Sequence, residues 1–357
     1  MSKFIPKTTD CMKNSKEVTI YDIAHRLDIS PSTVSRGLNN HPSVTKGTRK
    51  RVLDMAKLMG YRTNLFARNL QKQRTHTLGV IVPKLNSNFQ SSVLAGIEKV
   101  ANTAGYNLLI SQSLETETKE VANAAVMFNS RVDGLIVSLA SDTKKFSHFE
   151  PFFEKNIPVI FFDRVADGKL STNVVIDNFK AGYDATSHLI DQDCKRIVHI
   201  TGNLSRNVYA DRMKGYRQAL AERNIPFEEK YVISNNLDEK SAVEAAKQLL
   251  TMKPMPDGLF ITNDNCAAIC MQMLKNANYN IPGDIRIVGF NNDLITTLVE
   301  PNLTTVNYPG QEMGEIVANA IVNHLEGKAP MTVTSTIILK SELLIRESSL
   351  KNSKKEN

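Results

Sequence analysis

Residues 19–40, TIYDIAHRLDISPSTVSRGLNN, decide the architecture of the N-terminal part of this chain. Their apolar residues recur at helical spacing in two short runs, which a turn at 28–30 separates. Thr19 and Ser30 can each accept the first backbone N–H groups of a helix, and Pro31 suits a first helical position. The pattern therefore predicts two short helices joined by a tight turn.

A third helix is expected from Thr45 to Met59, with Gly60 as its end. Its inward residues would be Val52, Leu53 and Ala56. The outward residues of the second helix would be polar, namely Ser32, Thr33, Ser35 and Arg36. Three short helices of this kind are typical of a helix-turn-helix, whose second helix enters the DNA major groove. Two helices joined by a tight turn also occur in ordinary helical proteins.

The positive charge of the N-terminal segment favours nucleic-acid binding over an ordinary helical role. Residues 1–75 hold 15 Lys and Arg against 5 Asp and Glu, whereas the whole chain has a formal net charge of only +7. The rest of the chain is therefore slightly acidic. A small cationic module joined to a larger acidic body is the layout of a nucleic-acid reader attached to something else. A solvated basic tail does not fit, because apolar residues recur at helical spacing between the charges.

The body from Thr77 onward alternates apolar runs with helical stretches, which indicates parallel sheets with both faces covered by helices. It is too long for one comfortable core, so two α/β lobes are expected. The expected strands are 77–82, 107–112, 134–139, 159–163, 174–177, 196–201, 259–262, 287–290 and 303–307. The expected helices include 89–104, 179–191, 212–223 and 241–251.

Several motifs resemble the lactose-repressor/purine-repressor (LacI/GalR) family of transcriptional regulators. They are the opening stretch quoted above, TRKRVLDMAKLMGY, ARNLQ, TLGVIVP, VDGLIVS, VVIDN, the Arg212 region, ITND, IVGFNND and LTTVNYP, and they cover 18–346 in the family's order. The resemblance implies a periplasmic-binding-protein-like core in which the chain crosses between two lobes three times. One lobe would hold 76–176 and 307–334, and the other 178–304 and 337–347.

The implied organisation has five parts. They are a disordered extension at 1–17, a helix-turn-helix domain at 18–61, a hinge helix and linker at 62–75, a two-lobed effector-binding and dimerisation domain at 76–347, and a disordered tail at 348–357. The last eleven residues contain one apolar residue, Leu350, so no coiled-coil seam can form there. We therefore expect a homodimer rather than a tetramer.

The resemblance also implies which residues contact DNA. Pro31, Ser32 and Arg36 match base-reading positions, and Arg36 is the strongest candidate because a guanidinium can bond bidentately to guanine. The positions that match phosphate contacts are Thr19, Thr33, Ser35, Asn39 and Thr48. In the hinge segment the matching residues are Asn64, Ala67, Arg68 and Leu70, with Leu70 as a minor-groove wedge. Packing on the core is an equally good reading for the neighbouring Leu65 and Phe66.

Polar residues follow several expected strands, and ligands of open α/β sheets bind beyond those strand ends. By family position and by this placement, the effector-binding candidates are Phe89, Gln90, Asp163, Arg164, Arg212, Leu237, Asn263 and Asn291. Two of them depart from the family, which usually has an acidic residue at Asn291 and often an aromatic one at Leu237. Without an aromatic residue at the position of Leu237, a purine ring would have no side chain to stack on, so a sugar is favoured over a purine. Because Arg164 and Arg212 are present, an acidic sugar such as a uronate or sugar phosphate stays on the list.

Other function classes find little support. Four cysteines without paired spacing indicate a reducing cytoplasm, and Cys266 and Cys270 are read as small buried residues. We expect no cofactor, no metal, no catalytic residue, no export signal and no membrane span. The alternatives are a sugar-binding protein or a sugar-metabolising enzyme that shares the two-lobed core. The expected function is a DNA-binding transcriptional regulator that acts as a repressor and is controlled by a small molecule.

Overall fold

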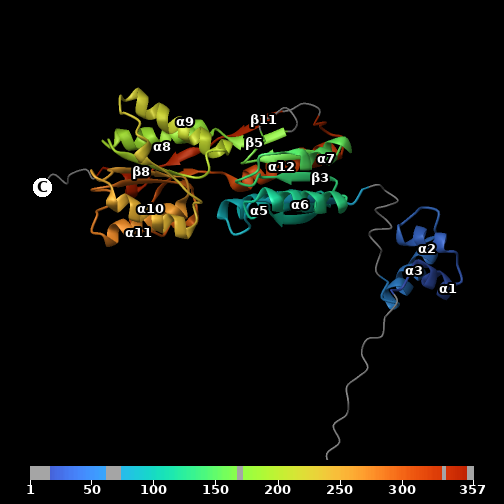
Figure 1. Ribbon diagram of the computed structural model, residues 1–357. Helices are drawn as coiled ribbons and strands as arrows, with labels where there is room; N and C mark the ends of the chain where they lie inside the picture. Colours follow the sequence, from blue (N-terminus) through green and yellow to red (C-terminus); the bar gives the residue numbers. More distant parts are fainter. Residues whose placement is uncertain (1–16, 62–73, 167–171, 332–334, 352–357) are drawn as a thin grey trace, which may run out of the picture. The chain divides into compact units, whose positions relative to one another are not determined.

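The computed structural model describes residues 17–61, 74–166, 172–331 and 335–351. The chain forms two compact units, which divide between Gln73 and Arg74 (Figure 1). Each unit has a hydrophobic core of its own.

The described part of the first unit, residues 17–61, contains three helices, α1 (Ile20–Leu27), α2 (Pro31–Leu38) and α3 (Lys46–Leu58). Each begins at a hydroxyl cap: Thr19 and Ser30, as the sequence predicts, and Thr45, which was predicted as the helix start. Asp22 completes a capping box with Thr19, so two backbone donors are satisfied at once. The core of this unit is formed by Ile23, Ala24, Val34, Val52 and Ala56.

The predicted inward position of Leu53 is wrong. Its side chain is 48% exposed, whereas Val52 is fully buried and Ala56 nearly so. A helix advances about 100° per residue, so Leu53 lies beyond the edge of the buried stripe that Val52 and Ala56 define. Half-buried Met55 and Met59 pack against the core beside Val52 and Ala56.

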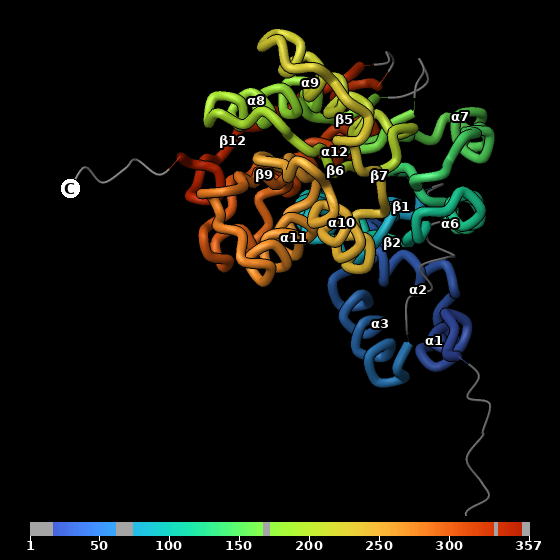
Figure 2. Tube along the Cα trace, turned by 60° about the vertical axis from the view of Figure 1, so that its left-hand side comes forward, coloured from blue at the N-terminus to red at the C-terminus, as the bar shows by residue number. Residues whose placement is uncertain are grey.

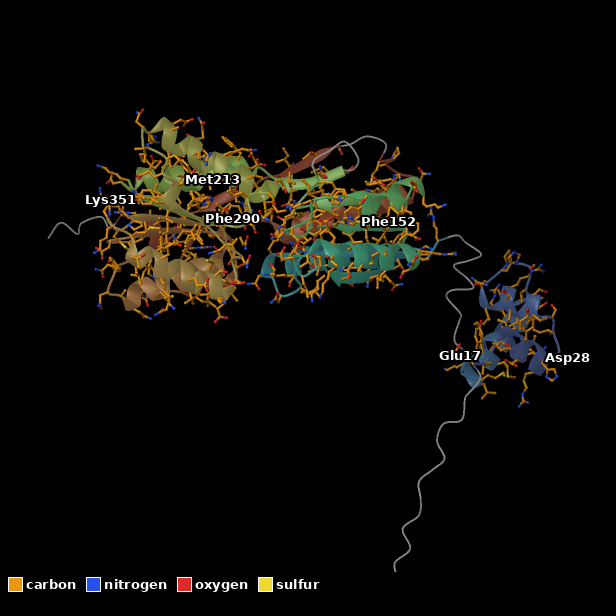
Figure 3. All side chains as sticks on the ribbon, in the orientation of Figure 1. Glu17, Asp28, Phe152, Met213, Phe290 and Lys351 are labelled. Atoms are coloured by element: carbon orange, nitrogen blue, oxygen red, sulfur yellow. The ribbon has the colours of Figure 1, made fainter. Side chains whose placement is uncertain are left out.

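The first lobe of the body is built on a six-stranded parallel sheet of order β11-β5-β4-β3-β1-β2. Its strands are β1 (Thr77–Val82), β2 (Asn107–Gln112), β3 (Gly134–Val137), β4 (Val159–Phe162), β5 (Thr172–Ile176) and β11 (Thr336–Leu339). One face is covered by α5 (Asn88–Thr103) and α12 (Gly310–Leu325), and the other by α6 (Glu117–Asn129), η1 (Ser147–Phe149) and α7 (Glu150–Glu154). Phe152 of α7 is buried inside this lobe (Figure 3).

The second lobe repeats the plan in the order β12-β10-β9-β8-β6-β7, with β12 antiparallel to β10. Its strands are β6 (Ile197–Thr201), β7 (Val232–Ser234), β8 (Gly258–Ile261), β9 (Arg286–Asn291), β10 (Thr304–Asn307) and β12 (Glu342–Leu344). Helices α8 (Asn178–Asp191) and α9 (Asn207–Glu222) cover one face, and α10 (Glu239–Thr251) and α11 (Asp264–Asn276) the other (Figures 1 and 2). Short η2 (Glu229–Tyr231) and η3 (Leu294–Thr297) precede β7 and follow β9.

The chain crosses between the lobes after β5, after β10, and between β11 and β12, as the resemblance implies. One predicted boundary is wrong. Residues 337–339 were expected in the second lobe but belong to β11, which pairs in parallel with β5 of the first. The strand is short and three of its four residues are exposed, so its sequence carries no buried pattern that would reveal it.

The expected disordered tail from 348 needs a second correction. Ser348 and Ser349 are fully buried in a short helix, η4 (Glu347–Ser349), against the base of the second lobe. Ser348 Oγ donates to Ile287 O (2.7 Å), and Ser349 Oγ lies 2.7 Å from His188 Nε2. Burial lowers the pKa of His188. Polar residues dominate this segment, so composition alone suggested disorder, but its hydroxyls are satisfied inside the fold.

Candidate functional site

The predicted DNA-reading residues of the first unit lie on or beside α2. Ser32 and Arg36 are exposed, Pro31, Thr33 and Ser35 are half-buried, and Asn39 follows the helix. Ser30 Oγ lies 2.8 Å from both Ser32 Oγ and Thr33 Oγ1, so a small hydroxyl cluster marks the helix start. The arrangement presents polar side chains along one exposed surface of α2.

The remaining predicted DNA contacts divide into two groups. Thr19 is the exposed cap of α1, and Thr48 lies in the first turn of α3, 3.0 Å from Thr45 Oγ1. Tyr21 on α1 is 68% exposed and was not among the predicted residues. The four hinge candidates, Asn64, Ala67, Arg68 and Leu70, lie outside the described residues.

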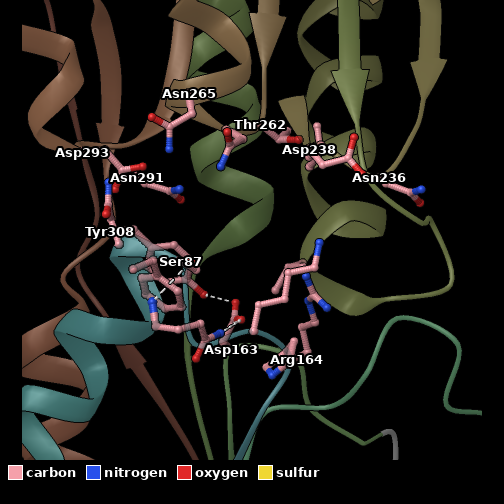
Figure 4. A pocket seen from close by; sticks show the side chains of 18 of the residues that line it. Ser87, Asp163, Arg164, Asn236, Asp238, Thr262, Asn265, Asn291, Asp293 and Tyr308 are labelled. Atoms are coloured by element: carbon pink, nitrogen blue, oxygen red, sulfur yellow. Dashed lines mark hydrogen bonds between the residues drawn. The ribbon is translucent and has the colours of Figure 1, made fainter. Parts of the chain in front are cut away.

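A cavity of about 290 Å³ opens between the two lobes, where loops at the carboxyl ends of both sheets meet. Its lining includes all eight predicted effector residues: Phe89, Gln90, Asp163, Arg164, Arg212, Leu237, Asn263 and Asn291. Asn265, Asn291 and Asp293 of the second lobe face Asp163 and Arg164 of the first (Figure 4). The volume is close to the lower end of the range of about 300–1,000 Å³ for small-molecule sites.

Asp163 is the most connected group in the cavity. It follows β4 with a left-handed backbone (φ 58°), and its carboxylate accepts from Tyr308 Oη (2.7 Å), Gln90 Nε2 (3.3 Å) and Ser138 Oγ (3.3 Å). Burial raises the pKa of this carboxyl. The same contacts leave Gln90 Oε1 buried without a partner among the described residues, so this oxygen can accept a bond from a ligand.

Arg212 presents a cation from α9. Its guanidinium lies 3.5 Å from the centroid of the Phe290 ring, and its Nε donates to Asn178 Oδ1 (2.9 Å). Burial lowers the pKa of Arg212. Within the described residues its terminal nitrogens have no hydrogen-bond partner, so they are available to an acceptor in the cavity.

Arg164, by contrast, is already paired. Its Nη1 lies 2.6 Å from Glu115 Oε2, and its Nη2 donates to Tyr209 Oη of the other lobe (3.2 Å). The ion pair therefore neutralises one of the two arginines on which the acidic-sugar hypothesis depends.

Asn263 and Asn291 have different surroundings. Asn263 caps α11 by accepting from Cys266 N (2.9 Å) while also lining the cavity. Asn291 ends β9 with φ 118° and hydrogen-bonds to the carboxyl of Asp293, whose pKa burial raises. Beneath them, burial raises the pKa of Asp264 to about 7, although Asp264 accepts from Asp293 N (2.9 Å) and Thr305 Oγ1 (2.8 Å). Cys266 and Cys270 are buried, as predicted.

Sequence reasoning missed Tyr308, the residue that joins the two halves of the site. It follows β10, stacks on Phe89 (centroids 4.1 Å apart) and meets Phe290 edge-on (5.8 Å). Its position directly beyond a strand end is the signal that found Asp163 and Asn291, and it could have found Tyr308 too. Met213 and Phe290 mark the buried interior of the second lobe behind it (Figure 3).

One segment of the second lobe, 203–207, also bonds to the first lobe beside the cavity. Asn203 Nδ2 donates to Ser141 O (2.9 Å), Arg206 donates to Thr143 O, and Asn207 Nδ2 donates to Asp163 O (3.0 Å). These bonds bring the lobes together on one side of the cavity.

The described residues hold no cluster of His, Cys, Asp and Glu that could bind a metal ion. None of the helices they form is both long and apolar enough to cross a membrane.

Comparison with known proteins gives the lineage. Residues 19–64 match the family model for bacterial regulatory proteins, lacI family, and residues 186–349 match the periplasmic binding protein-like domain. The chain is 32% identical over 322 residues to catabolite control protein A of Priestia megaterium, covering 90% of this chain and 96% of that protein. This chain belongs to the lacI family. It is therefore a DNA-binding transcriptional regulator built from a helix-turn-helix unit and a periplasmic-binding-like body.

Other lacI-family comparisons agree. The regulator RegA of Clostridium saccharobutylicum is 31% identical, covering 93% of this chain and 99% of that one. The fold matches a lac repressor dimer bound to operator and the anti-inducer ONPF (TM-score 0.82, 21% identity, 94% and 100% of the chains). It also matches a LacI regulator from Alkaliphilus metalliredigens complexed with D-xylulofuranose (TM-score 0.67, 25% identity, 77% and 100%).

Proposed function

We propose that this lacI-family regulator is a repressor that binds a pseudo-palindromic operator as a homodimer and is controlled by a neutral sugar in the interlobe cavity. One observation carries the choice of ligand. Seven carboxamide side chains line the cavity: Asn86, Asn88, Gln90, Asn236, Asn263, Asn265 and Asn291. An amide offers both donors and an acceptor but no charge, which suits a ring of hydroxyl groups.

The charged groups of the lining support a neutral rather than an acidic sugar. Arg164 is paired with Glu115, and the described lining holds five carboxyl side chains (Glu115, Asp163, Asp238, Glu239 and Asp293) against three cationic ones (Lys84, Arg164 and Arg212). Arg212 is then the one lining arginine without an acidic partner among the described residues, and it can bond to a hydroxyl as well as to a carboxylate. The sugar in the Alkaliphilus regulator, D-xylulofuranose, carries no charge either.

A thermal-shift panel tests the ligand class. Neutral pentoses and hexoses should raise the melting temperature of the protein, because a ligand that binds only the folded state stabilises it. Uronates and sugar phosphates should give smaller shifts. Asn265→Ala, which removes a lining amide of α11, should reduce the shift, while Asn276→Ala at the far end of the same helix should not. A larger shift with a uronate than with any neutral sugar would reverse the choice.

Arg36→Ala tests operator reading. If Arg36 bonds a guanine, the variant should bind operator about 1–3 kcal/mol more weakly and lose preference at one base pair per half-site. Lys57→Ala, an exposed basic residue at the end of α3, is the control for charge loss. Equal weakening on every operator variant would make Arg36 a phosphate contact instead.

We further infer that the cavity senses its sugar rather than converting it, that the sugar releases the operator, and that the protein works in the cytoplasm. The relatives above are regulators, which supports sensing. NMR spectra of the sugar after incubation with the protein would reveal turnover, and operator titrations with the sugar would give the sign of control.

A further inference from the structure

We propose that Asp133 is a positioning residue that fixes the chain arriving from the DNA-binding unit to the first lobe. Asp133 directly precedes β3, and its carboxylate accepts three hydrogen bonds from the chain that leads into β1. Thr75 N (2.8 Å) and Thr75 Oγ1 (3.1 Å) donate to Oδ1, and His76 N (2.8 Å) donates to Oδ2. We call this set of bonds the Asp133 clasp.

Neighbouring contacts hold the same short stretch of chain, residues 74–76. Arg74, the first residue of the second unit, donates from Nη2 to Leu325 O at the end of α12 (2.8 Å). His76 has a left-handed backbone (φ 50°) and places its ring 5.4 Å from that of Tyr106. A left-handed conformation is strained for a residue with a side chain, so it persists only where surrounding contacts hold it. The clasp thus sets the direction in which the chain enters the first lobe.

The second lobe contains an equivalent clasp, but the chain that enters it does not come from the DNA-binding unit. Asp257 directly precedes β8, and its Oδ1 accepts from Lys195 N (2.9 Å) and Arg196 N (2.7 Å), the residues that lead into β6. The sequences match: VDGLIV at 132–137 and PDGLFI at 256–261. Such an aspartate is therefore part of the frame of each lobe. What differs is the preceding chain, since β6 follows α8 of its own lobe and β1 follows the DNA-binding unit.

The clasp lies at the opposite end of the sheet from the cavity. Asp133 contacts residues before β1, whereas Pro83 and Lys84, which follow β1, line the cavity. Six strand residues separate the two ends, which is roughly 20 Å. A substitution at Asp133 therefore leaves the cavity unchanged, and any effect on DNA binding comes through residues 74–76.

The test compares Asp133→Ala with Asp257→Ala in the full-length protein. Its probes are the palindromic duplex that the wild-type protein selects from a random library, a single half-site duplex, and palindromes with one or two base pairs inserted at the centre. The test rests on the proposed dimer. A dimer that holds two DNA-binding units in a fixed geometry binds a palindrome more tightly than a half-site, by about 10²–10⁴-fold when the geometry is optimal.

We expect Asp133→Ala to lower the ratio of palindrome to half-site affinity by about tenfold, with half-site affinity unchanged within about twofold. The variant should also tolerate the inserted base pairs better than the wild type, because its units are held less tightly. Asp257→Ala, which also removes an ion pair with Arg196 (3.0 Å), should lower the melting temperature at least as much yet keep the wild-type ratio and spacing profile. Asp133→Asn, which retains Oδ1 for Thr75, should give an intermediate spacing profile and serves if the alanine variant does not fold.

Two outcomes overturn the proposal and are distinguishable. If the wild type prefers palindromes but Asp133→Ala and Asp257→Ala change that preference equally, the clasp has only a structural role. If the wild type binds palindrome and half-site equally well, the proposed dimeric reading fails, and the positioning role of Asp133 fails with it.

Discussion

The two lobes of the body share a frame but differ in what is attached to it. In each lobe a pair of helices crosses at glycines, α5 and α12 in the first and α8 and α9 in the second. A Cβ added at Gly96 or Gly314, or at Gly182 or Gly215, would lie less than 3.0 Å from backbone atoms of the partner helix. The repeated crossing shows that close helix approach is a property of the frame.

The attachments are specific to each lobe. The first lobe receives the chain from the DNA-binding unit through the Asp133 clasp, and the second takes η4 into its base. The second lobe also supplies Arg212, whereas the first supplies Asp163. The two lobes therefore share their sheets and helix pairs, and they differ in function through the polar residues at the two ends of each sheet.

The largest expected effect comes from removing η4. A chain ending at Arg346 leaves His188, Thr304 N and Ile287 O without their serine partners, and each buried polar group left unsatisfied costs about 1–3 kcal/mol. We expect a loss of about 3–5 kcal/mol in the free energy of unfolding, measured by urea titration. A chain ending at Lys351 is the control and should match the wild type. Equal stability of both chains would show that η4 is dispensable.

The glycine crossings come next. Gly314→Ala and Gly215→Ala should each destabilise the body by about 3 kcal/mol, because the added methyl group forces a helix pair apart. Gly47→Ala on α3 has nothing within 4 Å and should be neutral or slightly stabilising. Calorimetry would measure all three. A large loss in one lobe and none in the other would break the equivalence of the two frames.

A pH effect belongs to the second lobe. The pKa of Asp264 is about 7 in the folded protein, against about 3.9 for an unfolded aspartate. Between these values the folded state binds a proton that the unfolded state has lost. The contribution of Asp264 to stability therefore falls as pH rises from about 4 to about 7, by at most about 1.4 kcal/mol per pH unit. Asp264→Asn should remove this slope from unfolding curves recorded across that range; parallel pH profiles would contradict it.

The smallest effect concerns the contact between the lobes. Asn203→Ala removes the exposed bond to Ser141 O and should favour an open cavity by about 0.5 kcal/mol, which is about a twofold loss of sugar affinity. Asn102→Ala removes an exposed amide that bonds only within its own helix, to Glu98. Calorimetric titration with the best neutral sugar of the thermal panel compares them. Identical affinities would leave Asn203 without a role in closure.

Long strands were predictable and short edge strands were not. The bounds of β1 match the predicted strand at both ends, because a continuous apolar run marks it clearly, and those of the edge strand β2 match too, because it is six residues long and contains the apolar run 108–110. Strands β7, β11 and β12 were missed, since they are three or four residues long and lie at sheet edges, where few side chains are buried. Only pairing in three dimensions identifies such strands.

The cavity lining was largely predictable, and its bonding was not. Strand-end position and family resemblance brought all eight candidates to one cavity. Neither could show that Glu115 neutralises Arg164 or that Tyr308 bonds to Asp163, because these pairs join residues far apart in the sequence. That information narrowed the favoured ligand from sugars in general, acidic ones included, to neutral sugars.

The three crossings of the chain between lobes have a consequence for protein synthesis. The first lobe contains α12 and β11, and the second lobe contains β12 and η4, all from the last part of the sequence. Neither core can therefore be completed until nearly all of the body has left the ribosome. The helices α1, α2 and α3 need only one another and can fold as soon as they emerge. A nascent chain thus passes through a stage at which its helix-turn-helix is folded and its sensor is not.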